Sequence, residues 1–167
     1  VFFDDVRVPK KNRVGEENQG WTVAKYLLEF ERGGSFSGML TAMAGKIQAI
    51  AMAERAGDGR RLIEDPAFAR KAAEAEIEIK AIEITEHRVM SALSGGKNPG
   101  PASSMLKTRG SEMAQKLDEI AIEAVSFYAM PEQKAAREPG ANVEPVGPHH
   151  ALTAVPRYLN NRAASIY

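Results

Sequence analysis

Apolar residues recur every three or four positions along most of this chain, and that spacing predicts long helices. The first helix is expected over 20–56, a stretch without proline, and Gly57 is placed to cap its C-terminus. One stripe along this helix is shared by Leu28, Glu31, Ser35, Met39, Ala42, Lys46, Ala49 and Ala53. The row beside it widens the apolar surface and consists of Leu27, Leu40, Met43, Ile47 and Ile50.

The same periodicity predicts two further helices. Asp65 and Pro66 form a helix start, because an oxygen acceptor at the N-cap precedes a proline at the first helical position. This second helix is expected to end at Ser94, with Phe68, Ala72, Ala75, Ile79, Ile82, Val89 and Leu93 on its buried face. The third helix is expected from Ser103 to Ala129, with Leu106, Gly110, Met113, Leu117, Ile120, Ala124 and Phe127 on its buried face.

The remaining segments predict an extended start and an irregular excursion. Residues 2–8 ("FFDDVRV") predict a strand, and its partner strand is expected outside this chain because no later segment has strand character. Residues 131–150 are rich in proline and predict a surface excursion, after which a last helix begins near Pro156. We therefore expect an all-α, up-and-down four-helix bundle over 20–167, with 1–19 as a hinge from a preceding β-domain of a larger chain.

Composition narrows the possible functions. Lysine and arginine total 22, as do aspartate and glutamate, so there is no basic excess of the kind that nucleic acids or acidic membranes require. The absence of cysteine excludes disulfides, thiolate metal sites and cysteine nucleophiles, and agrees with the cytoplasmic location that we expect. Apolar runs are far shorter than a membrane span. Adjacent histidines at His149-His150 point apart, so no metal site is expected.

The stretch "YLLEFERGGSFSG" is unusual inside a long apolar-periodic segment. It places Glu31 and Arg32 side by side, directly before Gly33 and Gly34, and Gly38 follows. Each glycine in a helix interior costs about 1 kcal/mol relative to alanine, so this cluster needs a structural or functional reason.

Three segments of the chain resemble the C-terminal helical domain of the acyl-CoA dehydrogenase family. "FFDDVRVPKKNRVGEENQGW" is similar to the family's hinge from its β-domain, and "LLEFERGG" to the Glu-Arg step of its first long helix. "PRYLNNRAASIY" is similar to the last helix, just before the family's Tyr-Glu-Gly-Thr or Tyr-Gly-Gly step. The order and separation of these segments match the family over nearly the whole chain.

The resemblance implies an FAD flavoprotein of fatty acid metabolism that oxidises the Cα–Cβ bond of an acyl-CoA thioester. A carboxylate removes the α-proton while the β-hydrogen leaves as hydride to the flavin. Family members place that carboxylate either before the arginine of the first long helix, here Glu31, or directly after the tyrosine that corresponds to Tyr167. Arg32 would then set the local charge, and the three glycines (Gly33, Gly34 and Gly38) would let substrate or flavin approach the backbone.

Two departures from the family pattern are visible. The family's Arg-x-x-Phe-Gly step, which reaches the FAD of a neighbouring subunit, is represented by Arg60 and Arg61 without Phe-Gly. The Gly-Gly turn near the FAD adenosine is replaced by residues 124–130 ("AVSFYAM"). The resemblance thus implies a divergent branch acting on unusual acyl-CoAs, a homo- or hetero-oligomer, and an electron acceptor such as a flavoprotein.

Several interpretations stay open beside this one. Glu31-Arg32 can be a surface ion pair, the glycines can mark close helix packing, and Arg60-Arg61 can be a solvated turn. Trp21 is expected to anchor the core. The bundle can also serve oligomerisation or partner binding without catalysis, or belong to a same-fold flavin oxidase. Alone, the chain is expected to be inactive and to bind FAD weakly or not at all.

Overall fold

The computed structural model describes residues 1–31, 35–98 and 100–166. Helices are the only regular elements that these residues form, so the predicted all-α class is confirmed. The α-helices are α1 (Gly20–Glu31), α2 (Ser37–Ala53), α3 (Pro66–Ser94), α4 (Pro101–Val125), α5 (Lys134–Arg137) and α6 (Ala154–Asn161). Short 3₁₀ turns are η1 (Lys10–Asn12), η2 (Leu62–Glu64), η3 (Ser126–Ala129), η4 (His149–Thr153) and η5 (Arg162–Ser165).

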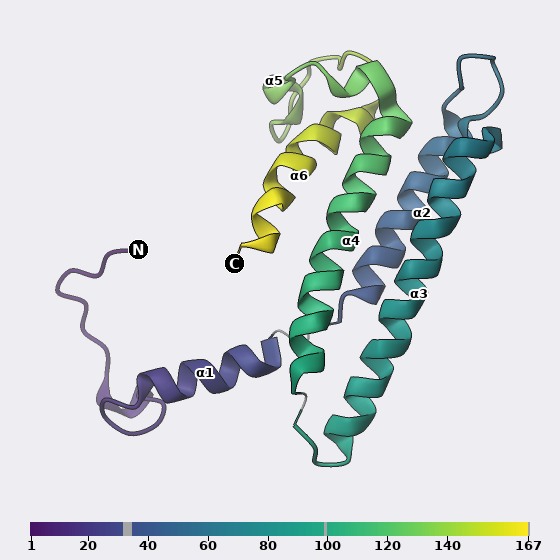
Figure 1. Cartoon of the computed structure of the whole chain (residues 1–167). Coiled ribbons are helices and arrows are strands. Elements are labelled where there is room, and N and C mark those ends of the chain that lie inside the picture. Colours follow the sequence, from purple (N-terminus) through teal and green to yellow (C-terminus); the bar gives the residue numbers. More distant parts are fainter. Residues whose placement is uncertain (32–34, 99, 167) are drawn as a thin grey trace.

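Helix α4 lies at the centre of the arrangement. It packs against α2, α3 and α6, and α2 and α3 also pack against each other. The chain reverses direction between successive long helices, and α6 descends along α4 towards the C-terminus, while α1 stands away from the other helices (Figure 1). The end of α1, the start of α2 and the end of the chain therefore all approach the lower half of α4.

The core forms where α2, α3 and α4 meet. Its most deeply buried large side chains are Leu40, Phe68, Leu106 and Leu117, each at most 1% exposed, while Val125 lies in a second buried cluster with Ala129, Ala151 and Ala154. Burying a side chain of this size stabilises the fold by about 1.5–3 kcal/mol. The predicted faces of the second and third helices are largely confirmed: six of the seven residues expected on each are in the core cluster or packed against it, or are buried glycine.

One member of the third stripe, Phe127, is exposed, contrary to the prediction. Helix α4 ends at Val125, and Ser126 adopts a positive φ of 51°, which breaks the helical register. Phe127 belongs to the following 3₁₀ turn, so its side chain no longer continues the buried stripe.

The predicted single helix over 20–56 is wrong. The described residues form two helices, α1 and α2, and Ser35 and Phe36 before α2 are not helical. At the start of α2 the backbone amides of Phe36 and Ser37 donate to Glu86 of α3 and not to carbonyl groups of a preceding helical turn. The buried face of α2 consists of Leu40, Met43, Ile47 and Ala51, which lies beside the stripe that contains Met39, Lys46 and Ala49.

Of the two helix boundaries predicted near residue 60, the helix end at Gly57 is wrong and the helix start at Asp65 is confirmed. Gly57 is not a helix cap, because α2 already ends at Ala53 and the extended residue Glu54 follows it. The predicted start of α3 is confirmed: Asp65 Oδ1 accepts hydrogen bonds from the backbone N–H groups of Ala67 (3.0 Å) and Phe68 (2.9 Å).

The first nineteen residues form no strand, contrary to the prediction for 2–8. A lone strand leaves its backbone groups without partners, and none of the described residues offers a pairing edge to this segment. Phe2 and Phe3 are highly exposed, and Trp21, expected in the core, is 73% exposed on α1. Between 131 and 150 the chain is irregular as expected, apart from the single turn of α5 and the start of η4.

Candidate functional site

The residues predicted to act in catalysis cluster at the junction between α1 and α2. Glu31 is the last residue of α1, and its side chain lies outside the described part of the structure, as do Arg32, Gly33 and Gly34. Gly38 is the second residue of α2, and a Cβ added there would meet no atom within 4 Å. Gly38 therefore leaves open space beside the first turn of α2, and the roles of these five residues remain predictions.

The first turn of α2 is held by a carboxylate from α3. Glu86 accepts hydrogen bonds from the backbone N–H groups of Phe36 and Ser37, the latter at 3.1 Å, and from the hydroxyls of Ser35 (3.4 Å) and Ser37. Only 7% of Glu86 is exposed. A buried carboxylate is costly unless it is fully hydrogen-bonded, and the free N–H groups at a helix N-terminus supply such bonds together with a favourable dipole.

The start of α2 also packs tightly against α4. The ring of Phe36 lies over Gly110, and a Cβ added to Gly110 would lie 2.4–2.8 Å from three ring carbons. Real carbon atoms do not approach this closely, so α4 needs glycine at this position for Phe36 to occupy its place. The glycine is buried in the middle of a helix, where its conformational cost is compensated by this contact.

The C-terminal segment is anchored to the same part of α4. Lys107 Nζ donates to the carbonyl oxygen of Ala164, and Gln115 Nε2 donates to Ser165 Oγ at 2.7 Å. Lys107 lies one helical turn before Gly110, against which Phe36 packs. The start of α2 and the end of η5 are thus both fixed on one turn of α4, although they are more than 120 residues apart in sequence.

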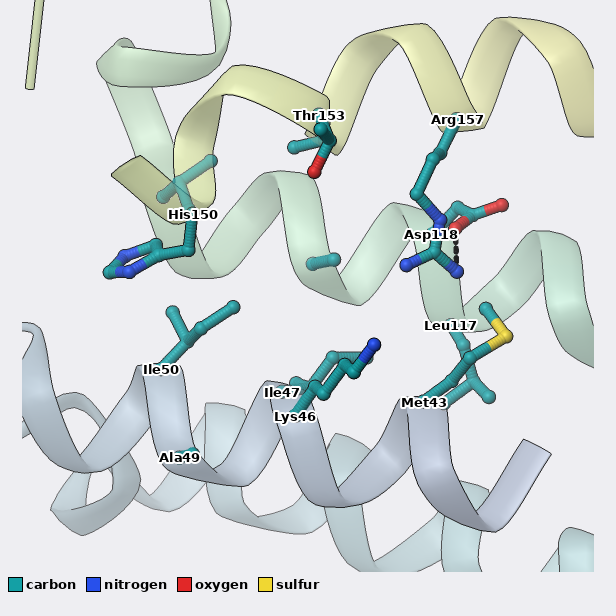
Figure 2. A pocket seen from close by; sticks show the side chains of 13 residues that line it. Met43, Lys46, Ile47, Ala49, Ile50, Leu117, Asp118, His150, Thr153 and Arg157 are labelled. Atoms are coloured by element: carbon teal, nitrogen blue, oxygen red, sulfur yellow. Dashed lines mark ion pairs between the residues drawn. The ribbon is translucent and has the colours of Figure 1, made fainter. Parts of the chain in front are cut away.

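A groove between α2, α4 and α6 has a volume of about 270 Å³. Figure 2 shows its mainly apolar floor, with Lys46 extending from α2 into the space below α6. The residues that line it are Met43, Lys46, Ile47, Ala49, Ile50, Leu117, Asp118, Ala121, Val125, His150, Thr153, Ala154 and Arg157.

Asp118 is the buried charge of this groove, with only 2% of the residue exposed. Its Oδ2 accepts a hydrogen bond from Asn161 Nδ2, and its Oδ1 lies 3.5 Å from a guanidinium nitrogen of Arg157. Burial raises the pKa of Asp118, while the hydrogen bond from Asn161 and the charge of Arg157 act in the opposite direction. The carboxyl therefore links α6 to α4 at an energetic cost that depends on its protonation.

Arg60 and Arg61 lie at the opposite end of α2 from Glu31, since a helix of 17 residues is about 25 Å long. The Arg60 guanidinium pairs with Asp58 at 2.6 Å, and this hydrogen bond lowers the pKa of Asp58. For Arg61 the described residues provide no side-chain partner, and its side chain is exposed. The loop itself is ordered by an antiparallel bridge between Arg55 and Arg61, so it presents two cations on a fixed backbone.

The contacts of the histidines and the apolar length of the helices bear on metal binding and on membrane insertion. His150 Nε2 lies 2.8 Å from Glu54 Oε1, which ties the irregular segment to the end of α2. Across the described residues, acidic and histidine side chains do not gather in threes or more at a spacing suited to a metal ion. None of the described helices is both long and apolar enough to cross a membrane.

Sequence reasoning missed Glu86, although its pattern contains a usable indication. Position 86 falls between Ile82 and Val89 in the buried stripe of α3, so a charged residue there has to find partners inside the protein. Gly110 stood in the predicted stripe of α4, but its partner Phe36 could not be identified without the tertiary arrangement. For Lys107 and Asp118, the sequence pattern does not indicate that they contact other segments of the chain.

Comparison of the sequence with known proteins identifies a family model that the chain matches. Residues 18–146 match the family model described as "Acyl-CoA dehydrogenase, C-terminal domain". The chain is 28% identical over 145 residues to acyl-CoA dehydrogenase FadE26 of Mycobacterium tuberculosis, covering 84% of this chain and 36% of that protein.

Two other relatives are similar over a comparable part. The caffeyl-CoA reductase-Etf complex subunit CarC of Acetobacterium woodii is 31% identical over 130 residues, which cover 77% of this chain and 34% of CarC. The L-prolyl-[peptidyl-carrier protein] dehydrogenase of Pseudomonas fluorescens is 30% identical over 127 residues, covering 73% of this chain and 33% of that enzyme. The chain therefore spans about a third of the length of the curated relatives that it matches.

Proposed function

Because this chain belongs to the acyl-CoA dehydrogenase family, we propose that it is the C-terminal helical domain of a longer FAD-dependent enzyme, called here the parent protein. The proposed reaction is α,β-dehydrogenation of an acyl-CoA thioester. The observation that carries this proposal is the family match across α1 to α5, which includes the start of α2 and the turn of α4 at Gly110 against which Phe36 packs.

Glu31 is the proposed base. Its carboxylate would remove the proton from Cα of the thioester, in a pocket kept poor in water so that a carboxylate is basic enough to do so. Arg32 would set the charge around it, while Gly33, Gly34 and Gly38 would leave room for ligand beside the helix backbone. The open space around Gly38 agrees with this role. FAD, when bound, would accept the β-hydrogen as a hydride.

The loop after α2 has side chains that suit the phosphate groups of FAD. Arg61 is exposed and cationic and lacks a side-chain partner among the described residues, so it can donate to a pyrophosphate without breaking an existing contact. Arg60 would first have to release Asp58. Since this loop lies at the far end of α2 from Glu31, its proposed contact is with the FAD of a neighbouring subunit.

An alternative base fits the same geometry. If the parent protein has a glutamate directly after Tyr167, that carboxylate would follow η5, which Lys107 and Gln115 hold against α4. In this proposal both candidate positions would lie near the turn of α4 that begins at Lys107, and the site would be the same whichever residue removes the proton.

The proposed partners follow from the family and from one relative. CarC is named as a subunit of a complex with Etf, which supports an electron-transferring flavoprotein as acceptor for the parent protein. Trp21, Tyr26 and Leu27 are exposed apolar side chains on α1, and they suit coverage by other parts of the parent protein or by a second subunit in an oligomer.

The proposal is tested with Glu31→Gln in the full-length parent protein. The measurement is exchange of the substrate α-proton for deuterium, followed by mass spectrometry, because exchange reports proton removal without requiring turnover. We expect Glu31→Gln to lose exchange by roughly 10²-fold or more. Glu17→Gln, an exposed carboxylate shortly before α1, is the matched control and should exchange normally. Normal exchange in Glu31→Gln would remove Glu31 from the mechanism.

A further inference from the structure

We propose that Glu86 is a positioning residue for the catalytic carboxylate: by fixing the start of α2 it sets where the end of α1 presents Glu31. This inference rests on the proposed function of Glu31. Glu86 itself lies on α3 and is separated from its partners by about 50 residues of sequence, so the contact is tertiary and not local.

The contact is unusually complete for a single side chain. Both carboxylate oxygens of Glu86 are used: Oε1 accepts from the amides of Phe36 and Ser37, and Oε2 accepts from the hydroxyls of Ser35 and Ser37. Three consecutive residues are therefore held by one group. Hydrogen bonds to a buried carboxylate are about twice as strong as bonds between neutral groups, so the start of α2 is strongly fixed to α3.

The same arrangement argues against Glu86 as the base itself. A base needs a free oxygen directed at the proton that it removes, and both oxygens of Glu86 already accept hydrogen bonds from protein groups. Its burial, with 7% of the residue exposed, also leaves it without open access to a ligand. Glu86 can affect proton removal only by placing another group.

The connection to Glu31 is short. Ser35 follows Glu31 by four residues, a stretch that spans at most about 14 Å even when fully extended. Phe36, the next residue, is fixed a second time by its packing over Gly110 of α4. Glu86 and Gly110 together fix Ser35 and Phe36, the described residues that follow Glu31 most closely in sequence, so loss of the Glu86 contact is expected to let Glu31 shift relative to α4.

The test uses single and double variants of the parent protein with bound FAD. Glu86→Gln keeps the shape of the side chain but removes the charge and one pair of acceptors. We expect it to lower the rate of α-proton exchange by between about tenfold and a hundredfold, the usual effect of misplacing a reacting group by about 1 Å, with KM changed by less than about twofold. Glu83→Gln, one turn earlier on α3, is the matched control and should exchange at the wild-type rate, since the partners of Glu83 among the described residues are Lys80 and His87.

The double variant Glu31→Gln/Glu86→Gln separates positioning from general damage. If Glu86 acts through Glu31, adding Glu86→Gln to Glu31→Gln causes no further loss of exchange; a purely structural defect would lower the residual rate again. Equal losses in both backgrounds would overturn the inference.

Amide hydrogen exchange tests whether Glu86 anchors α2, independently of whether Glu31 is the base. Glu86→Gln should lose protection at Phe36 and Ser37 and retain it in the middle of α4, around Leu117. If Glu31→Gln leaves α-proton exchange unchanged while protection at Phe36 and Ser37 is lost, the proposed base is wrong and the anchoring of α2 stands. If protection at these amides is unchanged in Glu86→Gln, the anchoring itself is wrong.

Discussion

Gly110→Ala tests the contact that joins the start of α2 to α4. The added Cβ would lie 2.4, 2.5 and 2.8 Å from three carbons of the Phe36 ring, whereas carbon atoms in good contact are about 3.5–4.0 Å apart. The ring therefore has to move by roughly 1 Å as a rigid body, since the contact involves its attachment carbon and not a flexible tip. Overpacking of this kind costs about 1–3 kcal/mol.

The helix itself gives the opposite contribution. Alanine is favoured over glycine in a helix interior by about 1 kcal/mol, so the net loss expected for Gly110→Ala is between about 0 and 2 kcal/mol. Gly45→Ala is the matched control, because Gly45 is also inside a helix but a Cβ there meets no atom within 4 Å. That control should gain about 1 kcal/mol, since only the helix contribution applies.

The assay is thermal unfolding followed by circular dichroism. For a chain of this size 1 kcal/mol shifts Tm by about 2–4 °C, so Gly110→Ala should unfold about 2–12 °C below Gly45→Ala, a gap set by the overpacking cost of about 1–3 kcal/mol. Phe36→Leu combined with Gly110→Ala should recover part of the loss, because the smaller side chain leaves room for the methyl group. Equal stabilisation by Gly110→Ala and Gly45→Ala would show that Phe36 does not occupy this position.

Three further outcomes follow from the structure. Burial raises the pKa of Asp118, so the native state keeps this proton to a higher pH than the unfolded chain, and the free energy of unfolding should fall as pH rises above about 4. In denaturant titrations at several pH values, Asp118→Asn should flatten that decline. An unaltered dependence of the free energy of unfolding on pH would contradict this prediction. Asp65→Ala should cost about 0.5–2 kcal/mol in the same titrations because two amides of α3 lose their acceptor, and a loss below a few tenths would contradict the cap. The isolated chain should elute from gel filtration without a flavin absorbance band, and a retained band would show that it binds FAD alone.

The helical class and the second and third helices could be predicted from the sequence because their information is local. Asp65 followed by Pro66 specifies a helix start through hydrogen bonds to residues two and three positions away. The apolar stripes of α3 and α4 depend on helical periodicity alone. These features do not require knowledge of what packs against them.

The errors arose where tertiary contacts or missing partners decide the structure. The break before α2 depends on Glu86, about fifty residues away, which offers acceptors to amides that a continuous helix would have used internally. Trp21, at the start of the first helix, was expected to anchor the core, yet α1 stands away from the other helices and leaves it exposed. The segment 2–8 has strand character without a partner among the described residues, so composition alone was misleading.

The candidate site could be predicted only from the family resemblance. The structure shows which groups fix the described chain segments next to it. Glu31 and Arg32 were singled out by their position before two glycines, but nothing in periodicity identified Glu86 and Lys107 as the groups that fix the two neighbouring chain segments. Such contacts combine residues from three helices. They become visible only when the helices are placed in space.

The central claim, that Glu31 faces substrate and not solvent, is tested most directly by an experimental structure of the parent protein with FAD and a non-reactive acyl-CoA analogue. The account predicts a Glu31 carboxylate oxygen within about 3–3.5 Å of the analogue's Cα, in a pocket closed to water. A Glu31 side chain in open water, on the side of the helices away from the thioester, would contradict the claim and leave only the fold assignment.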